Sequence, residues 1–380
     1  MKYMGSKRAM LHNGLGDLLS HEVASAERFV DLFSGSGAVS AHVAQLYAVP
    51  VLALDLQQFS AVLTGAVISR QEKLDWAPVW DRWQGRAKSR LGRRRIPAAD
   101  KLTRNVVKDL RIWCNRQGGT PITQAYGGHY FSPRQALWID SLRATLPKDE
   151  PARTVALASL VQAASQCAAA PGHTAQPFQP TRTGKPYLRE LWERDPVERT
   201  KRALEILAEQ FAKEPGRAEI GDANQVAKRL REGDLVFIDP PYSGVQYSRF
   251  YHVLETIVRG TCGSVSGVGR YPAPELRPHS KYSLKRESTK ALDDLLQCLA
   301  ARRARAILTF PDHDCSNGLS GESVRQIACR HFRITERAVE SKFSTLGGTG
   351  DERPDEAGRA SRHETSELIL VLEPQSAAGG

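Results

Sequence analysis

The sequence lacks long apolar runs, clustered cysteines and metal-ligand spacings, and these absences exclude several classes of protein. No apolar run approaches the roughly 20 residues that a membrane-spanning helix needs, and the first residues lack the apolar core of a signal peptide. The six cysteines are scattered without a Cys-x-x-Cys pair, which argues against a disulfide framework and a cysteine zinc cluster. His173, His252 and His313 have no carboxylate or cysteine partners at ligand spacing. We therefore expect a cytoplasmic protein that binds neither a metal nor a membrane.

Positive charge, in contrast, is in excess. The 380 residues include 53 basic and 42 acidic side chains, a net charge of +11 that favours a polyanionic partner. Residues 71–118 alone hold 13 basic against five acidic residues. Three tryptophans begin this stretch: Trp76, Trp80 and Trp83. It is either a solvated helical face with a small tryptophan core or a surface that contacts phosphates. Arg93, Arg94 and Arg95 lie between a glycine and a proline, which is typical of a loop and makes them candidate DNA contacts.

The hydrophobic pattern predicts a layered α/β fold. A short apolar strand at 28–33, a glycine turn, a helix at 38–48 and a second buried strand at 51–54 form one βαβ unit. Further continuous apolar strands are expected at 235–238, 306–310 and 367–372. Helical spacing is found at 153–169, 198–213, 289–304 and 322–331. Continuous apolar strands are typical of a parallel sheet covered on both faces, so we predict a doubly wound, mostly parallel sheet.

The length predicts two to three domains, and the middle of the chain interrupts the α/β rhythm. We expect a first half of the sheet domain at 1–70, a basic insert at 71–185 and a second half at 186–374. The helix 153–169 could belong to the insert or to the sheet. Residues 347–362 are rich in glycine and charge and are expected to form a flexible loop, with a disordered tail at 375–380.

The glycine turn predicts a ligand site with unusual chemistry. Position 40 holds Ser40 where the dinucleotide fingerprint has its third glycine, and no Gly-Lys-Ser/Thr phosphate loop is present. Asp31 lies in the C-terminal half of the first strand, just ahead of the turn, and a carboxylate there suits a cationic group better than a pyrophosphate. Asp55 ends the next strand, where such folds bind a ribose diol. The pair fits a nucleoside that carries an amino acid, S-adenosylmethionine; the alternative is that both carboxylates only cap strand ends.

The tetrapeptide Asp239-Pro240-Pro241-Tyr242 directly follows the strand at 235–238. Its prolines end the strand and leave the Pro240 carbonyl free of ladder pairing. The motif then offers two acceptors, the Asp239 carboxylate and this carbonyl, beside the ring of Tyr242. This set suits the exocyclic amine of a planar base, which would be held by both acceptors while the ring stacks on it.

With these motifs in this order, the chain resembles the alpha-type, D12-class adenine-N6 DNA methyltransferases, which are similar to the Dam methylases. The resemblance rests on residues 2–8 (Lys-Tyr-Met-Gly-Ser-Lys-Arg), 29–37, Asp55, 221–223 and 239–242. It implies a sheet of the S-adenosylmethionine-dependent methyltransferase type with an inserted target-recognition region. The implied cofactor contacts are Tyr3, Lys7, Asp31, Phe33, Gly35, Gly37, Asp55 and Asp222. Asp239, Pro240 and Tyr242 are the implied catalytic residues.

The implied activity is site-specific transfer of a methyl group from S-adenosylmethionine to the N6 amine of a flipped adenine in duplex DNA. Methylation of cytosine N4, an RNA target, and a non-catalytic nucleic-acid-binding protein of the same fold remain alternatives. Tyr247 and Arg249 follow the tetrapeptide and could contact DNA, whereas Tyr251 and Leu254 could instead begin a core helix. A nucleoid location and a partner restriction or phage-defence system are compatible with this activity.

Overall fold

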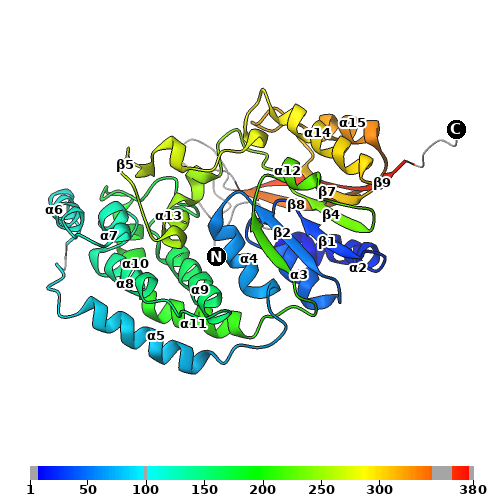
Figure 1. The fold of residues 1–380 in the computed structure, drawn as a ribbon. Helices are drawn as coiled ribbons and strands as arrows, with labels where there is room; N and C mark the ends of the chain where they lie inside the picture. Colours follow the sequence, from blue (N-terminus) through cyan, green and yellow to red (C-terminus); the bar gives the residue numbers. More distant parts are fainter. Residues whose placement is uncertain (1–6, 98–100, 345–361, 376–380) are drawn as a thin grey trace. The chain divides into compact units, whose positions relative to one another are not determined.

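A computed structural model describes residues 7–97, 101–344 and 362–375 (Figure 1). Its contacts divide the chain into two units. The helical unit comprises Gln57–Phe211 and Ser248–Pro278, and the sheet unit comprises Met4–Leu56, Ala212–Tyr247 and His279–Gly380. Tyr3, the expected loop up to residue 361 and the tail residues 376–380 lie outside the described residues.

The sheet unit is built on seven strands in the order β3-β2-β1-β4-β7-β9-β8. Their bounds are β1 Arg28–Asp31, β2 Val51–Asp55, β3 Arg217–Ile220, β4 Asp234–Ile238, β7 Arg305–Pro311, β8 Phe332–Ser344 and β9 Arg362–Pro374. The first five strands in this order are parallel, β9 is antiparallel to β7, and β8 is antiparallel to β9. The mostly parallel α/β sheet expected from the sequence is confirmed.

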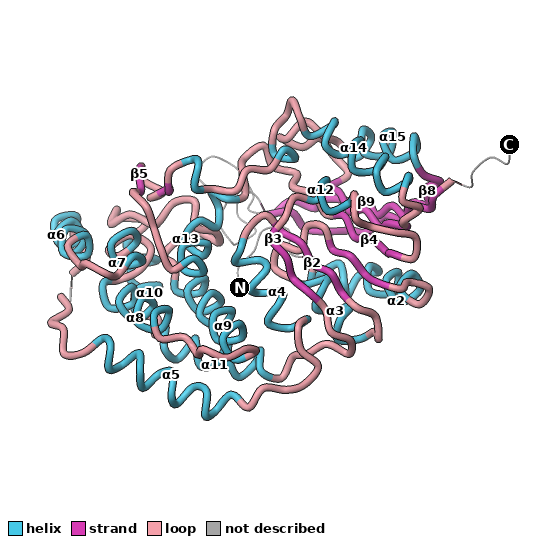
Figure 2. Tube along the Cα trace, in the orientation of Figure 1, coloured by secondary structure: helices cyan, strands magenta, loops and turns pink. Residues whose placement is uncertain are grey.

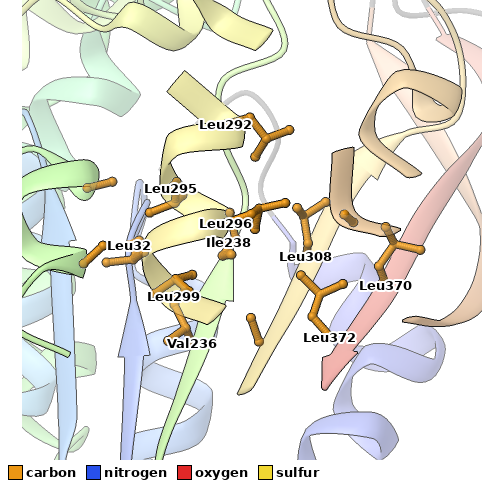
Figure 3. Close-up of a cluster of buried hydrophobic side chains, with 14 of the residues drawn as sticks. Leu32, Val236, Ile238, Leu292, Leu295, Leu296, Leu299, Leu308, Leu370 and Leu372 are labelled. Atoms are coloured by element: carbon orange, nitrogen blue, oxygen red, sulfur yellow. The ribbon is translucent and has the colours of Figure 1, made fainter. Parts of the chain in front are cut away.

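Helices cover both faces of this sheet because its strands are apolar on both sides. One face carries α12 (Ala223–Ala227), α14 (Ser288–Ala301) and α15 (Gly321–His331); the opposite face carries α2 (Gly16–Val23) and α3 (Ala38–Leu46) (Figure 1). Figure 3 shows four leucines of α14 over Val236 and Ile238 of β4 and over Leu32, which directly follows β1. Each leucine buried in this way contributes about 1.5–3 kcal/mol relative to exposure. The remaining short helices of the unit are α1 Arg8–Met10, η1 Leu11–Leu15 and η3 Lys281–Ser283.

The strand order identifies the edge of the sheet at which a ligand is expected. β1 has β2 on one side and β4 on the other, and the chain reverses its direction of progress across the sheet at this point. Open α/β sheets bind ligands at such a switch point, beyond the carboxyl ends of the strands. Asp31 pairs with Phe237 in the β1–β4 register, so Asp239 lies only two residues beyond the partner of Asp31.

The helical unit packs around one central helix, α9, which is buried on nearly all sides (Figure 2). Its helices are α4 Gln58–Ile68, α5 Trp76–Leu91, α6 Arg104–Asn115, α7 Pro121–Tyr126, α8 Pro133–Ala144, α9 Ala152–Cys167, α10 Lys185–Glu193, α11 Pro196–Ala208 and α13 Ser248–Arg259. A hairpin of β5 (Val265–Ser266) and β6 (Tyr271–Pro272) and the short η2 (Pro274–Leu276) complete it. Residues 71–185 lie within this unit, which also takes in α4, α10 and α11 because α9 packs against all three.

Most of the strands and loops predicted from the sequence form in the structure. Every strand predicted from an apolar run forms, and Arg93, Arg94 and Arg95 lie in an exposed loop after α5. Tyr251 and Leu254 are each 1% exposed inside α13, so these two side chains are part of a helical core. The edge strands β3 and β8 were not predicted, because their sequences alternate polar with apolar residues instead of forming an apolar run.

Candidate active site

The turn after β1 is a tight glycine loop held by Asp55. Gly35 and Gly37 have φ angles of +50° and +74°, which residues with a Cβ rarely adopt. The Gly35 amide donates to Asp55 Oδ2 at 2.9 Å, and the Ser34 amide donates to the Leu54 carbonyl at 2.7 Å. The ends of β1 and β2 are therefore tied together, with both glycines and the Asp55 carboxylate at the same place.

Asp31 is buried at the end of β1 with its carboxylate partly satisfied. Ser40 Oγ donates to Asp31 Oδ2 at 2.6 Å, and the Phe33 amide donates to Oδ1 at 3.3 Å. Burial raises the pKa of Asp31 to about 7, although both hydrogen bonds oppose the shift. Ser40 thus has a clear role at the position where a dinucleotide site would have glycine: its hydroxyl holds Asp31.

Asp239 follows β4 and is fixed through one of its two oxygens. Lys7 Nζ lies 3.0 Å from Oδ1, and Thr309 Oγ1 donates to the same oxygen at 3.1 Å. Among the described residues, the structure gives Oδ2 no hydrogen-bond partner. Burial raises the pKa of Asp239 to about 6, while the Lys7 ammonium opposes the shift.

Lys7 joins Asp239 to a second carboxylate, that of Glu367. Lys7 is 4% exposed, and its Nζ lies 2.9 Å from Glu367 Oε2. Burial alone would lower the pKa of Lys7, but the two carboxylates outweigh burial and hold the pKa above its usual value. Glu367 and Thr309 were missed by the sequence analysis. The available signals were a carboxylate at the head of one apolar strand and a lone hydroxyl inside another.

The tetrapeptide loop after β4 is braced by the loop after β7. Asn317 is fully buried, and its Nδ2 donates to the carbonyls of Pro241 at 2.8 Å and Tyr282 at 3.0 Å. The Gly244 amide donates to Ser316 Oγ at 2.9 Å. These contacts fix the backbone on both sides of Tyr242.

The aromatic side chains at this edge are also held. The Tyr242 ring packs edge-on against Tyr247, with centroids 6.5 Å apart, and burial raises the pKa of its phenol to about 12. Phe33 packs edge-on against Tyr282 at 5.0 Å. With this raised pKa, the Tyr242 phenol is neutral across the ordinary pH range.

Asp222 caps α12 by accepting a hydrogen bond from the Gln225 amide at 3.1 Å.

The structure brings together most of the sequence-predicted cofactor and catalytic residues. Lys7, Asp31, Phe33, Gly35, Gly37, Asp55, Asp222, Asp239, Pro240, Tyr242 and Tyr247 belong to the sheet unit. Arg93, Arg94, Arg95 and Arg249 belong to the helical unit. Arg249 lies in the first turn of α13, and its Cζ lies over the Tyr271 ring, 4.8 Å from the centroid.

The helical unit contains a groove of about 770 Å³ whose lining is largely aliphatic and also includes Glu193. Arg94, Arg134 and Arg189 line it together with Trp138 and Trp192. The indole nitrogen of Trp192 is buried without a hydrogen-bond partner among the described residues. Guanidinium and indole groups are the side chains that most often contact phosphates and stack on bases.

The described part of the chain contains no group of three His, Cys, Asp or Glu side chains placed to hold a metal ion. No helix in the same residues has the length and apolarity to cross a bilayer.

The amino-acid sequence is similar to those of known DNA methyltransferases. Residues 3–84 and 148–271, more than half of the chain, match the family described as D12 class N6 adenine-specific DNA methyltransferase. Modification methylase LlaI of Lactococcus lactis subsp. lactis is 25% identical over 323 residues, which are 78% of this chain and 44% of that protein. Type II methyltransferase M.FokI of Planomicrobium okeanokoites is 27% identical over 78% of this chain and 42% of its own length.

Type II methyltransferase M.NlaIII of Neisseria lactamica is 26% identical over 276 residues, 68% of this chain and 69% of that protein. The matched part of the chain spans less than half the length of LlaI and M.FokI. The family match includes the glycine turn, Asp55 and the tetrapeptide at 239–242, and so confirms the resemblance seen in the sequence. The chain belongs to the family of D12 class N6 adenine-specific DNA methyltransferases.

Proposed function

We propose that the protein transfers a methyl group from S-adenosylmethionine to the N6 amine of an adenine at a specific site in duplex DNA. The observation that carries the proposal is the pairing of β1 with β4. This pairing places the glycine turn and the Asp239 tetrapeptide at the same edge of one sheet. One crevice can then hold both a cofactor and a target base.

The residues at the turn fit an amino-acid-bearing nucleoside. Asp31 offers a buried carboxylate for an ammonium group, and the Ser34 hydroxyl is buried without a partner among the described residues. Gly35 and Gly37 have no Cβ and adopt positive φ angles, which suits close approach of a ligand to the backbone. Asp55 would accept from the ribose, while Tyr3, Lys7, Phe33 and Asp222 are the further proposed contacts. S-adenosylmethionine, when bound, supplies a methyl group on a positively charged sulfur, which is already a strong electrophile.

The tetrapeptide would hold the target amine. Asp239 and the Pro240 carbonyl accept hydrogen bonds from the two N–H groups of this amine, and Tyr242 stacks on the adenine ring. With a pKa near 6, Asp239 is mostly ionised at neutral pH and is therefore an acceptor. The chain's contribution is mainly positioning and polarisation of the amine, because no strong base is needed. The adenine must first leave the duplex, and these contacts offset part of the unstacking cost of a few kcal/mol.

The helical unit would supply most of the contacts to the DNA backbone. The exposed Arg93, Arg94 and Arg95 support this role, as do the three arginines and two tryptophans among the residues that line the groove. Tyr247 and Arg249 are proposed as contacts beside the target base. The modification methylases among the relatives support a partner restriction system and a cytoplasmic, nucleoid-associated location.

The direct test is methyl transfer from labelled S-adenosylmethionine to duplex DNA, followed by mass analysis of the nucleosides. We expect N6-methyladenine from the wild type. We expect Asp239→Ala to lower transfer about 100-fold or more while binding of S-adenosylmethionine is retained. Asp17→Ala, which removes an exposed carboxylate of the same unit, is the control. N4-methylcytosine as the product, or no transfer to DNA, contradicts the proposal.

A further inference from the structure

We infer that the two oxygens of Asp239 have separate tasks and that Thr309 and Glu367 are positioning residues that enforce this division. Oδ1 is fixed by the protein, and Oδ2 is left to accept an N–H of the target amine. The inference rests on the proposed methyl transfer, because it assigns how that reaction's acceptor is held.

The contacts of Asp239 are one-sided. Lys7 Nζ at 3.0 Å and Thr309 Oγ1 at 3.1 Å both reach Oδ1. Asp239 retains 16% exposure, and among the described residues no donor reaches Oδ2. A carboxylate held through one oxygen by two donors cannot rotate freely, so its second oxygen keeps one direction.

Thr309 and Glu367 come from neighbouring strands at the same edge. Thr309 is fully buried in β7 and pairs in register with Ile369 of β9, two residues from Glu367. Glu367 Oε2 lies 2.9 Å from Lys7 Nζ, so the ammonium is held between two carboxylates. Without Glu367, the long lysine side chain would have one anchor fewer and a less defined place beside Asp239.

The charges around Asp239 act in opposite directions. Lys7 favours its ionised form, whereas Glu367 disfavours it, as does the Asp31 carboxyl when it is ionised. The Tyr242 phenol, with a pKa of about 12, is uncharged where Asp239 titrates. Thr309 favours the ionised form through its hydrogen bond. The ionised form is the stronger acceptor for an N–H on Oδ2, so these groups set the pH below which transfer weakens.

The pH dependence of kcat/KM for duplex DNA, measured at saturating S-adenosylmethionine, tests this arrangement. We expect Glu367→Gln to move the acid limb down by about one pH unit, since a neighbouring negative charge is removed. We expect Lys7→Met to move the same limb up by about one unit or more, since the favourable cation is removed. A structural defect alone would lower the rate without shifting the limbs in opposite directions.

A matched pair of variants tests Thr309. Thr309→Val keeps the volume but removes the donor to Oδ1, and we expect kcat to fall about tenfold. Thr309→Ser keeps the hydroxyl, and we expect it to restore most of the rate. Thermal melting and binding of S-adenosylmethionine identify variants that have not folded.

The outcomes separate this inference from the proposed function. If the wild type methylates adenine but the limbs of Glu367→Gln and Lys7→Met do not diverge, the inference is wrong and the function stands. Equal rates for Thr309→Val and the wild type would likewise overturn the positioning role. If the wild type transfers no methyl group to DNA, the proposed function itself is wrong.

Discussion

Asp31 is a carboxyl group that the fold stabilises poorly in its charged form. It is 1% exposed, and burial raises its pKa from the ordinary 3.8 to about 7. The folded chain therefore binds a proton at this site that the unfolded chain releases near pH 4. The free energy of unfolding should fall as the pH rises from about 4 to about 7, because ionised Asp31 is tolerated in the unfolded state and penalised in the folded one.

Asp31→Asn removes this dependence. We expect the stability of the variant relative to the wild type to rise by a few kcal/mol between pH 4 and pH 8, with little further change above pH 7. Chemical denaturation over this pH range measures the difference. The exposed Asp17→Asn should run parallel to the wild type, and a parallel curve for Asp31→Asn would contradict the raised pKa.

The same variant should bind S-adenosylmethionine more weakly, because Asn cannot pair with an ammonium group. A gain in stability at pH 8 together with a loss of cofactor affinity is typical of a residue kept for function. Isothermal titration calorimetry at pH 8 checks the second half of this expectation.

Individual site residues differ in how far the sequence could reveal them. Asp31 lies near the end of an apolar strand and Asp239 directly follows one, so their position at the carboxyl edge could be inferred from the strands alone. Glu367 and Thr309 act through Lys7 and Asp239, and that relation exists only once β7 and β9 are paired. Asn317 was missed for the same reason, since its partners are backbone carbonyls of two other loops.

At the scale of elements, two loops form the rigid support of the tetrapeptide. A Cβ added at Gly244 would lie 2.7 Å from the Ser316 carbonyl oxygen, so one of the two backbones would have to move. We expect Gly244→Ala to lower methyl transfer about 10- to 100-fold, because displacement of about 1 Å is enough to misalign reacting groups. Binding of S-adenosylmethionine should remain, since the glycine turn follows a different strand.

Gly85→Ala is the matched control for this substitution. Gly85 is exposed in the middle of α5, and a Cβ there meets nothing within 4 Å. We expect it to leave transfer unchanged and to stabilise the helical unit by about 0.5–1 kcal/mol, because alanine restricts the unfolded chain and favours helix. Equal rates for Gly244→Ala and Gly85→Ala would show that the contact between the loops is not needed.

The elements that could be predicted are those whose burial is complete. β4 and β7 are buried along nearly their whole length, and both were identified from the apolar runs at 235–238 and 306–310. β3, with the sequence Arg-Ala-Glu-Ile, is mostly accessible at the sheet edge and carries no such pattern. Its assignment depends on pairing with β2, which a local pattern cannot show.

At the scale of the whole molecule, the net charge of +11 could act generally or through particular contacts. The triple variant Arg93→Ala, Arg94→Ala and Arg95→Ala distinguishes the two. We expect its log K against log salt for duplex DNA to be shallower by up to about 3, because each phosphate contact contributes about 0.9 to the slope. Fluorescence anisotropy at several salt concentrations measures this slope.

The control removes the same charge from exposed arginines of the sheet unit: Arg229, Arg231 and Arg333. If the loop arginines contact phosphates, this second triple variant keeps nearly the full slope. If the slope falls equally in both variants, binding depends on the overall charge of the protein. If the slope changes in neither variant, Arg93, Arg94 and Arg95 do not contact DNA.

Lys7 and Glu367, which meet at 2.9 Å, are separated by 360 positions in the chain. During synthesis, at roughly 5–20 residues per second, on the order of 20–70 seconds pass between the appearance of one and of the other. Until β9 leaves the ribosome, the lysine has only one of its two carboxylate neighbours. A chain that terminates before β9 therefore lacks Glu367 and cannot form this ion pair. Only chains translated through β9 can hold Lys7 between both carboxylates.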